Sequence, residues 1–296
     1  MIYNIRLSII LFFVLFTIQV NALTLATYNI RNFDYDHFED VATNKEELSK
    51  VINGLKADLI SVQEVINLDA FKTFVEQYLP LYDYILTKCG GAGHQRLGFV
   101  YKRSKFQIKK FDEQKVGGKD GCHKGLRPAA IGTFKITGST KTITAITLHL
   151  KAGGQQRNAN IRLEQYKLIS TLIRNLKSKG LSNIIAFGDF NTTDYIFRNQ
   201  NYDRFINFVD DNSMRDFSSN LTCTSYWWGG IEDDIQYPSL LDHILVTKEF
   251  LREFKYFKVN AKAHCQKVLC SEASAEELGM TFKEVSDHCP VVVKLR

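Results

Sequence analysis

The chain lacks the features that divide long proteins or hold them in membranes. Its 296 residues include only 4 prolines, and they contain no Pro/Gly/Ser-rich linker, internal repeat or low-complexity tract. After residue 22, no stretch is apolar enough to cross a bilayer. Hydrophobic residues make up 45% of the chain, enough for a substantial core. This length suits one large domain, and we predict a single domain over residues 23–296.

The first 22 residues have a different character. Arg6 precedes an apolar run over residues 7–16, and Val20-Asn21-Ala22 follows. A lone positive charge, a short apolar core and small or β-branched residues before the cut match a signal peptide cleaved after Ala22. The run is too short for a comfortable membrane anchor. We expect a secreted monomer, extracellular or periplasmic, with no stable membrane anchor after cleavage.

The sequence also lacks any CxxC motif, which together with export argues against a zinc site. It has six cysteines, which in an exported chain indicate disulfide bonds but allow 15 pairings. Cys265 and Cys270 are close enough in sequence to close a short loop. The other pairings stay open.

No charge excess is strong enough to define a partner. The net charge is +6, of which Arg6 contributes one, and it mildly favours anionic partners. Between Lys109 and Arg127 the chain is rich in lysine and glycine, so a phosphate backbone could lie against this loop. An ordinary solvated loop would have the same composition.

Apolar periodicity predicts strands mixed with helices. Helical spacing predicts helices near 43–55, 67–79 and 158–176, the last with a stripe that includes Leu168. β-rich runs predict strands at 23–33, 57–62, 82–86, 95–101, 106–111, 127–134, 142–150, 184–187, 240–246, 254–259 and 290–295. The runs at 95–101 and 106–111 indicate neighbouring antiparallel strands. The pattern predicts two packed sheets with helices outside.

Polar residues stand at strand ends or in loops where strand packing does not need them: Asn29, Glu64, His149, Asp189 with Asn191, Asp242, and Asp287 with His288. Carboxylate and amide oxygens are the ligands that Mg²⁺ and Ca²⁺ prefer. Phosphodiester cleavage needs such a cation, a base for water and a donor for the leaving alkoxide. A histidine oriented by a carboxylate can serve either proton role. If these ends converge, the sequence predicts a metal-assisted phosphodiesterase.

Seven short motifs carry a resemblance. They are Tyr28-Asn29-Ile30-Arg31, Val62-Gln63-Glu64-Val65, Arg127-Pro128-Ala129, Leu148-His149-Leu150, Gly188-Asp189-Phe190-Asn191, Leu241-Asp242-His243-Ile244 and Ser286-Asp287-His288-Cys289-Pro290. In this order they resemble the endonuclease/exonuclease/phosphatase superfamily, and within it the deoxyribonuclease I-like secreted nucleases. The resemblance covers residues 24–295. It implies an α/β fold, a four-layer α/β sandwich of two central β-sheets flanked by helices.

The resemblance also implies roles for residues. Asn29, Glu64 and Asp287 would surround one divalent cation, Mg²⁺ with Ca²⁺ or Mn²⁺ as alternatives. Asp189 and Asn191 would form a second cation site or orient the attacking water. His288, held by Asp242, would share the acid/base step with His149, and either histidine can be the base. Arg127 would contact the scissile phosphate, with Arg31 as a further substrate contact.

Some positions depart from the resembled family. The partner expected beside His149 is a glutamate there, and the matching position here is Gln95, an amide that orients an imidazole without stabilising its charge. The two groups that enter the DNA minor groove in that family match Gly93 and Ile66 here. Duplex and single-stranded nucleic acid therefore both remain candidate substrates.

Tyr226-Trp227-Trp228-Gly229-Gly230 indicates a Gly-bounded aromatic loop. Trp227 and Trp228 can stack on the bases of single-stranded nucleic acid or enter a membrane interface. In the competing interpretation, one of them packs in the core and the other covers it.

We therefore expect a secreted metal-dependent nuclease that cleaves DNA, with RNA as a further substrate. The alternative is a secreted phospholipid phosphodiesterase of the sphingomyelinase type. A binding module without activity is a third option, and the complete set of acids and histidines argues against it.

Overall fold

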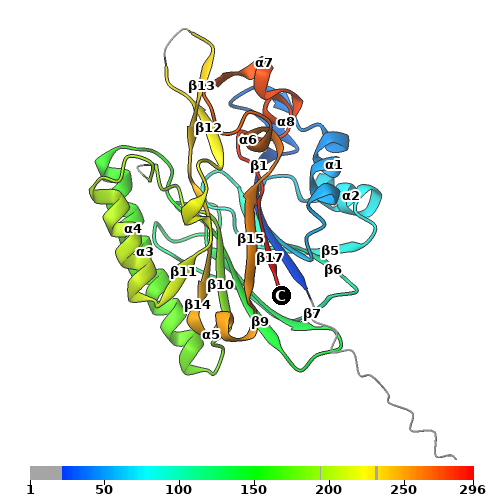
Figure 1. Cartoon of the computed structure of the whole chain (residues 1–296), viewed down its shortest axis with the longest axis vertical. Helices are drawn as coiled ribbons and strands as arrows, with labels where there is room; N and C mark the ends of the chain where they lie inside the picture. Colours follow the sequence, from blue (N-terminus) through cyan, green and yellow to red (C-terminus); the bar gives the residue numbers. More distant parts are fainter. Residues whose placement is uncertain (1–21, 194, 231–232) are drawn as a thin grey trace, which may run out of the picture.

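The computed structural model describes residues 22–193, 195–230 and 233–296, so the predicted signal peptide over residues 1–22 lies outside the described residues apart from Ala22. Two six-stranded sheets lie face to face (Figure 1). The strand orders are β15-β17-β1-β4-β6-β5 in the first sheet and β11-β14-β10-β9-β8-β7 in the second. No helix in the described part of the chain combines the length and apolarity that a membrane crossing requires.

The first sheet contains β1 (Leu23–Phe33), β4 (Leu59–Val65), β5 (Tyr82–Leu86), β6 (Arg96–Lys102), β15 (Tyr256–Ala261) and β17 (Val291–Leu295). The second contains β7 (Phe106–Gln114), β8 (Ala129–Ile136), β9 (Thr142–His149), β10 (Ile184–Asp189), β11 (Met214–Asp216) and β14 (Asp242–Thr247). The longer helices are α1 (Lys45–Leu55), α2 (Leu68–Tyr78), α3 (Gln156–Ser178) and α4 (Gln200–Asp211).

Shorter elements gather at the end of the sandwich that carries the polar strand ends. They include β2 (Tyr35–Asp36), β3 (Val41–Ala42), β12 (Ser225–Trp228), β13 (Ile235–Ser239), β16 (Ala273–Ser274), α6 (Ala263–Lys267), α7 (Ala275–Leu278) and α8 (Met280–Lys283). A 3₁₀ turn (Ser218–Asn220) and α5 (Lys248–Glu253) flank β14. Figure 1 shows the β12–β13 hairpin rising above the sheets.

Apolar side chains fill three layers between the elements. One core lies between the two sheets and includes Phe99, Phe134 and Phe187. A second core lies under α3 and α4, and a third lies under α1 and α2. Both faces of a central strand are buried, and β10 is buried at every position. Its residues 184–187 are therefore all apolar. The predicted four-layer sandwich is confirmed.

The expected pairing of residues 95–101 with 106–111 is wrong. β6 pairs with β4 and β5 in the first sheet, whereas β7 pairs with β8 in the second. The short turn between them crosses from one sheet to the other, so proximity in sequence does not produce a hairpin here. Leu168 also departs from the predicted stripe, since 43% of it is exposed on α3.

Three disulfides pair all six cysteines: Cys89–Cys122, Cys223–Cys270 and Cys265–Cys289. The expected Cys265–Cys270 loop closure is wrong. The Cys270 amide does donate to the Cys265 carbonyl at 3.1 Å, so the two backbones are close, but their side chains reach different partners. Cys122 joins the lysine-rich loop to Cys89, and β7 continues to Gln114, so this loop begins later than predicted.

Candidate active site

The polar strand ends converge at one edge of the sandwich because of the strand register. In the second sheet, Asp189 pairs with His149 on one side and with Asp242 on the other. The first sheet contributes Asn29 from β1, Glu64 from β4 and the segment before β17 that carries Asp287 and His288. The seven groups therefore come from two sheets that face each other.

Local chemistry at the end of β10 explains its Gly-Asp-Phe-Asn sequence. Gly188 has φ of 142°, and a Cβ there would lie 2.0 Å from the Leu148 carbonyl oxygen, so only glycine fits against β9. Phe190 is fully buried and anchors the turn. Asn191 adopts φ of 51°, and its amide N–H donates to Asp189 Oδ1 at 2.8 Å. The turn fixes the carboxylate of Asp189 in one orientation.

Glu64 sits in a distorted part of β4. It has φ of 68°, a left-handed conformation that a glutamate rarely adopts, and the pairing register with β6 shifts between Val62 and Val65. The distortion turns its carboxylate toward Asn29, whose side-chain Nδ2 donates to Glu64 Oε1 at 3.0 Å. The Asn32 amide N–H donates to Glu64 Oε2 at 2.9 Å.

The Oδ2 atom of Asp189 is the centre of the site. Asn29 Nδ2 donates to it at 3.2 Å, His149 Nε2 lies 3.3 Å away, and His288 Nε2 lies 3.7 Å away. Burial raises the pKa of Asp189 to about 7, and the neighbouring carboxylates of Asp242 and Glu64 add to this, against the opposing effect of His288. A buried acid titrating near neutrality, among imidazoles, can exchange a proton at physiological pH.

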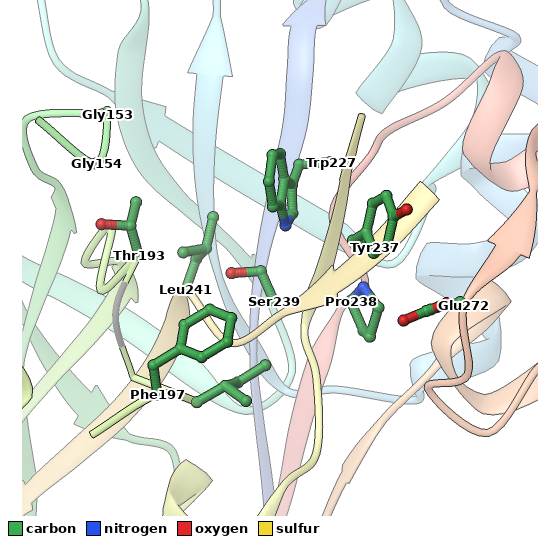
Figure 2. Close-up of a pocket in the computed structure, with 11 residues that line it drawn as sticks. Gly153, Gly154, Thr193, Phe197, Trp227, Tyr237, Pro238, Ser239, Leu241 and Glu272 are labelled. Atoms are coloured by element: carbon green, nitrogen blue, oxygen red, sulfur yellow. The ribbon is translucent and has the colours of Figure 1, made fainter. Parts of the chain in front are cut away.

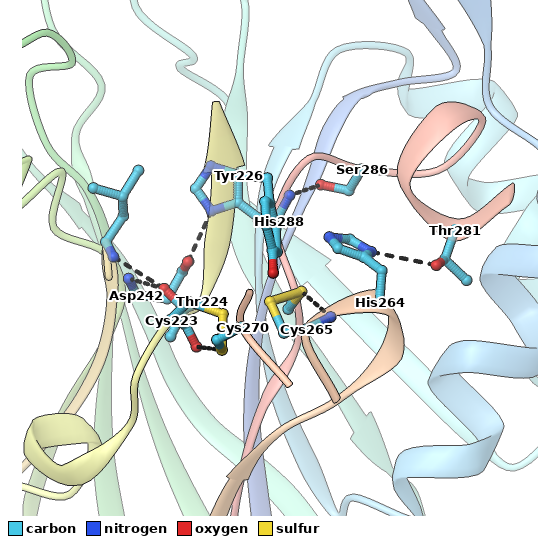
Figure 3. Close-up of a disulfide and its surroundings, with 12 residues drawn as sticks. Cys223, Thr224, Tyr226, Asp242, His264, Cys265, Cys270, Thr281, Ser286 and His288 are labelled. Carbon is cyan, nitrogen blue, oxygen red and sulfur yellow. Dashed lines mark hydrogen bonds and ion pairs between the residues drawn. A yellow bond between two sulfur atoms is a disulfide. The ribbon is translucent and has the colours of Figure 1, made fainter. Parts of the chain in front are cut away.

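His288 is held by hydrogen bonds at its backbone amide and at its ring. Its Nδ1 lies 2.8 Å from Asp242 Oδ2 (Figure 3). Its Nε2 lies 3.7 Å from Asp189 Oδ2. Its amide N–H donates to Ser286 Oγ at 3.0 Å, and Ser286 Oγ donates to the Asn29 carbonyl at 2.7 Å. Burial lowers the pKa of His288, but the carboxylates of Asp242, Asp287 and Asp189 outweigh it and hold the pKa well above its ordinary value. The ring therefore favours the cationic form.

His149 has the opposite electrostatic environment. Burial, with Arg127 and His288 nearby, holds its pKa well below the ordinary value, so the ring is neutral. Its Nδ1 is buried and has no hydrogen-bond partner among the described residues. We therefore assign the proton to Nε2, which lies 3.3 Å from Asp189 Oδ2 and 3.6 Å from Glu64 Oε1.

Arg127 forms hydrogen bonds with the backbone at the end of β9. Its Nε donates to the His149 carbonyl at 3.0 Å, its Nη2 to the Leu150 carbonyl at 2.6 Å, and its Nη1 to Gln95 Oε1 at 2.6 Å. These contacts position the backbone of His149. A guanidinium has five N–H donors, so donors also remain for a phosphate oxygen.

The expected contact between Gln95 and the His149 ring is wrong. Gln95 Oε1 accepts from Arg127, and its Nε2 donates to Asn32 Oδ1 at 2.8 Å. No described residue gives His149 Nδ1 a hydrogen bond. Gln95 therefore links Arg127 to Asn32 near the end of β1. The side-chain carbonyl oxygen of Gln95 is the acceptor for Arg127 Nη1.

Arg31 lies beside the site but is engaged elsewhere. Its Nη1 donates to the Phe282 carbonyl at 3.2 Å, its Nη2 donates to the Lys283 carbonyl at 2.8 Å, and its Nε lies 3.5 Å from Asp36 Oδ2. Arg31 therefore joins β2 to α8, and it lines the cleft described next.

A cleft of about 760 Å³ opens over the acids. Glu64, Asp287, Gln95, Arg31 and the two tryptophans belong to its lining. Trp227 and Trp228 lie in the β12 strand rather than on a loop, and they are 52% and 57% exposed. The interpretation in which one of them packs in the core is therefore wrong; Tyr226 fills that position.

The donor set fits a hard divalent cation. Glu64, Asp189 and Asp287 supply carboxylates, and burial followed by Asp287 raises the pKa of Glu64, a like-charge conflict that a cation would relieve. Asp242 Oδ1 is also buried without a partner among the described residues. Asn29 presents Nδ2 to the acids while its Oδ1 accepts from the Arg31 amide at 3.0 Å, so a ligand role requires its amide to turn over.

The acids are spread more widely than the ligands of a closed metal site. Within the described residues, His/Cys/Asp/Glu triads with ligand atoms inside 4.8 Å of one another consist of disulfide cysteines, in one case with His264. Mg²⁺ keeps several of its waters and binds through one or two carboxylates, so the wider arrangement suits it.

Mg²⁺ should therefore stabilise the folded protein. A cation at about 100 times its Kd adds about 2.7 kcal/mol, or roughly 5 °C in the melting temperature of a chain this size. We expect Glu64→Gln to lose most of this shift in differential scanning fluorimetry. Glu164→Gln, which removes an exposed carboxylate paired with Lys167, is the matched control and should keep it. Equal shifts in both variants would place the cation elsewhere.

Comparison with known proteins agrees with this geometry. The protein-family model described as "Endonuclease/Exonuclease/phosphatase family" matches residues 26–288 of the sequence. No curated protein sequence matches the chain. Among solved structures, a mannosyl-6-phosphatase of Bacteroides thetaiotaomicron is similar at 20% identity and TM-score 0.65, covering 93% of this chain and 99% of that one. D. rerio TDP2 complexed with single strand DNA product has 13% identity, TM-score 0.65 and the same coverage. The human Nocturnin catalytic domain has 13% identity and TM-score 0.63, covering 93% and 94%.

Sequence reasoning missed one residue that holds the two halves of the site together. Thr224 is fully buried, its hydroxyl accepts the amide N–H groups of Leu241 and Asp242 at 2.9 Å, and its carbonyl accepts the Cys289 amide N–H at 2.7 Å (Figure 3). It thereby joins the strand of Asp242 to the segment of His288. A threonine between a cysteine and a serine gives no local signal of this role.

Proposed function

Because the chain belongs to the endonuclease/exonuclease/phosphatase family, we propose that it is a secreted, divalent-metal-dependent nuclease. It would hydrolyse the phosphodiester bonds of single-stranded DNA or RNA by in-line attack of water. Members of this family are hydrolases of phosphoester bonds and generally use divalent metal ions, commonly Mg²⁺. The single observation that carries the proposal is the convergence of Asn29, His149 and His288 on one oxygen of Asp189.

Glu64 and Asp287 would hold the cation with Asp189, and Asn29 and Asn191 are the neighbouring amides. Bound there, a divalent cation supplies charge neutralisation at the phosphoryl oxygens. The remaining steps fall to the protein. Asp189 accepts a proton from the attacking water as the new P–O bond forms, and the P–O bond to the leaving alkoxide breaks.

The histidines have different tasks. His288 Nε2 lies 3.7 Å from the Asp189 oxygen, and Asp242 fixes its Nδ1, so the cationic ring stabilises the carboxylate that accepts the proton. Neutral His149 has its Nε2 3.3 Å from the same oxygen. In-line displacement places entering and leaving oxygens on opposite sides of phosphorus. The leaving alkoxide, opposite the attacking water, therefore needs its own proton, and cationic His288 would supply it from Nε2.

Several features support nucleic acid as substrate and export as the location. The lysine-rich loop leads into Arg127, and Trp227 and Trp228 expose ring faces beside the acids. One similar structure, TDP2, is a complex with single strand DNA product. The signal-like N-terminus and three disulfides support secretion.

The exposed tryptophans also favour one competing substrate class, because such side chains enter membrane interfaces. A sphingomyelinase-type phosphodiesterase is therefore the second candidate. The test is a parallel assay of mature protein, with Mg²⁺ or with EDTA, on single-stranded DNA, duplex DNA, RNA and sphingomyelin vesicles. We expect EDTA-sensitive cleavage of single-stranded nucleic acid. Sphingomyelin turnover without cleavage of any nucleic acid would overturn the proposal.

A further inference from the structure

A second cavity, of about 560 Å³, lies beside the acidic cleft (Figure 2). Its walls are mainly apolar and include Ile196, Phe197, Trp227, Tyr237, Pro238 and Leu241. Trp227 also lines the acidic cleft, so one indole borders both spaces. In the view of Figure 2 the Trp227 ring lies above Leu241 and Ser239, and the Phe197 ring lies below them.

The active-site segments run directly into this cavity. Leu241 immediately precedes Asp242, and its carbonyl accepts the Phe190 amide N–H at 2.9 Å. Thr193 follows Asn191 by two positions and donates its amide N–H to the Asn191 carbonyl at 2.8 Å. Gly153 lies four positions after His149. The segments that carry His149, Asp189 and Asp242 therefore also form part of the cavity wall.

The cavity keeps large apolar side chains in contact with solvent. Phe197 is 79% exposed, Trp227 is 52% exposed and Ile196 is 45% exposed. Scattered exposed hydrophobic residues are ordinary, but several around one concave space beside reactive groups are typical of a ligand site. The exposed rings of Phe197 and Trp227 provide aromatic faces for a flat ligand.

The polar groups that line the cavity indicate which class of ligand it can bind. Glu272 contributes an acidic side chain, and Thr193 and Ser239 contribute hydroxyls. The carboxylate of Glu272 repels a second phosphate. The exocyclic amino group of a nucleobase is a donor that a carboxylate accepts.

We propose that this cavity binds one nucleobase, the base of the nucleotide next to the scissile phosphate, with Phe197 and Trp227 against its faces. This inference rests on the proposed nuclease function and extends it. A base that enters such a cavity has left any duplex stack, so the substrate is single-stranded at this position.

The test uses two short oligonucleotides with a single cleavable phosphodiester. One carries bases throughout, and the other carries a base-free tetrahydrofuran nucleotide next to the cleavable bond, placed on each side in turn. We expect wild type to cleave the base-bearing strand with kcat/KM about 10-fold or more above the base-free one on one side only, as stacking of one base provides. Phe197→Ala should remove most of this preference by lowering kcat/KM on the base-bearing strand. Leu81→Ala, another exposed apolar side chain outside both cavities, should change neither.

The outcomes separate the two proposals. Equal cleavage of both strands by wild type would overturn the base subsite while leaving the nuclease intact, and so would a Phe197→Ala loss of equal size on both strands. Cleavage of neither strand, with phosphodiester hydrolysis of sphingomyelin vesicles, would overturn both. If Phe197→Ala then impairs sphingomyelin turnover, the cavity holds an acyl chain.

Discussion

Replacing Asp189 with asparagine should lower kcat on single-stranded DNA by about 10³-fold, within the range of lost proton-transfer and electrostatic groups. The amide preserves the shape of the side chain and can still accept the Asn191 amide N–H, but it cannot take a proton from water. It also removes the atom on which Asn29, His149 and His288 converge. Initial-rate kinetics at saturating Mg²⁺ would measure the effect.

The same substitution should not cost stability in the absence of divalent cations. Asp189 is a buried acid among the carboxylates of Glu64 and Asp242, and its neutral replacement relieves their repulsion. We expect an equal or higher melting temperature in EDTA. A large loss of melting temperature would mean that the lost activity reflects misfolding, and near-wild-type activity would contradict the assignment of Asp189.

A double variant provides a further check. His288→Ala alone should cost about 10²-fold or more, and combining it with Asp189→Asn should cost little beyond the worse single change, because groups that act as a unit are not additive. His123→Ala, which removes an exposed ring stacked on His94, should leave kcat unchanged. Fully multiplicative losses would show that the two residues act in separate steps.

Removing the Cys265–Cys289 disulfide should have the second largest effect. The bond closes a segment with a sequence separation of 24, so Cys265→Ser with Cys289→Ser should lower the free energy of unfolding by about 3 kcal/mol. Cys289 directly follows His288 and donates its amide N–H to the Thr224 carbonyl at 2.7 Å. Loss of the bond should therefore also loosen the His288–Asp242 pair and lower kcat well below the unfolding temperature.

The Cys89–Cys122 bond is the matched control for this experiment. Its sequence separation is 33, so its removal should cost a similar free energy of unfolding. It lies on the lysine-rich loop, away from His288, so kcat should change little. Urea titrations and kinetics on both double variants would measure this. Similar kcat losses in both would show that the disulfides act only through global stability.

The sequence alone predicted the strands of both sheets except β11, the helices α1, α2 and α3, and most residues of the candidate site, whereas it missed α4 and the β12–β13 hairpin. Strands with two buried faces appear as short apolar runs, and a polar residue at the end of such a run stands out locally. Asn29, Glu64, His149, Asp189 and Asp242 were identified in this way. Their order along the chain then matched one family, which fixed the four-layer arrangement.

Only the tertiary structure decided which partners those residues have. β6 and β7 are adjacent in sequence but join different sheets, because sheet membership depends on packing between distant strands. Gln95 contacts Arg127 rather than His149, and Thr224 joins two strand ends, through hydrogen bonds between groups far apart in the chain. The opposite pKa directions of His149 and His288 depend on burial and neighbouring charge. Periodicity and motif order record the local pattern, whereas these contacts arise only when both sheets are assembled.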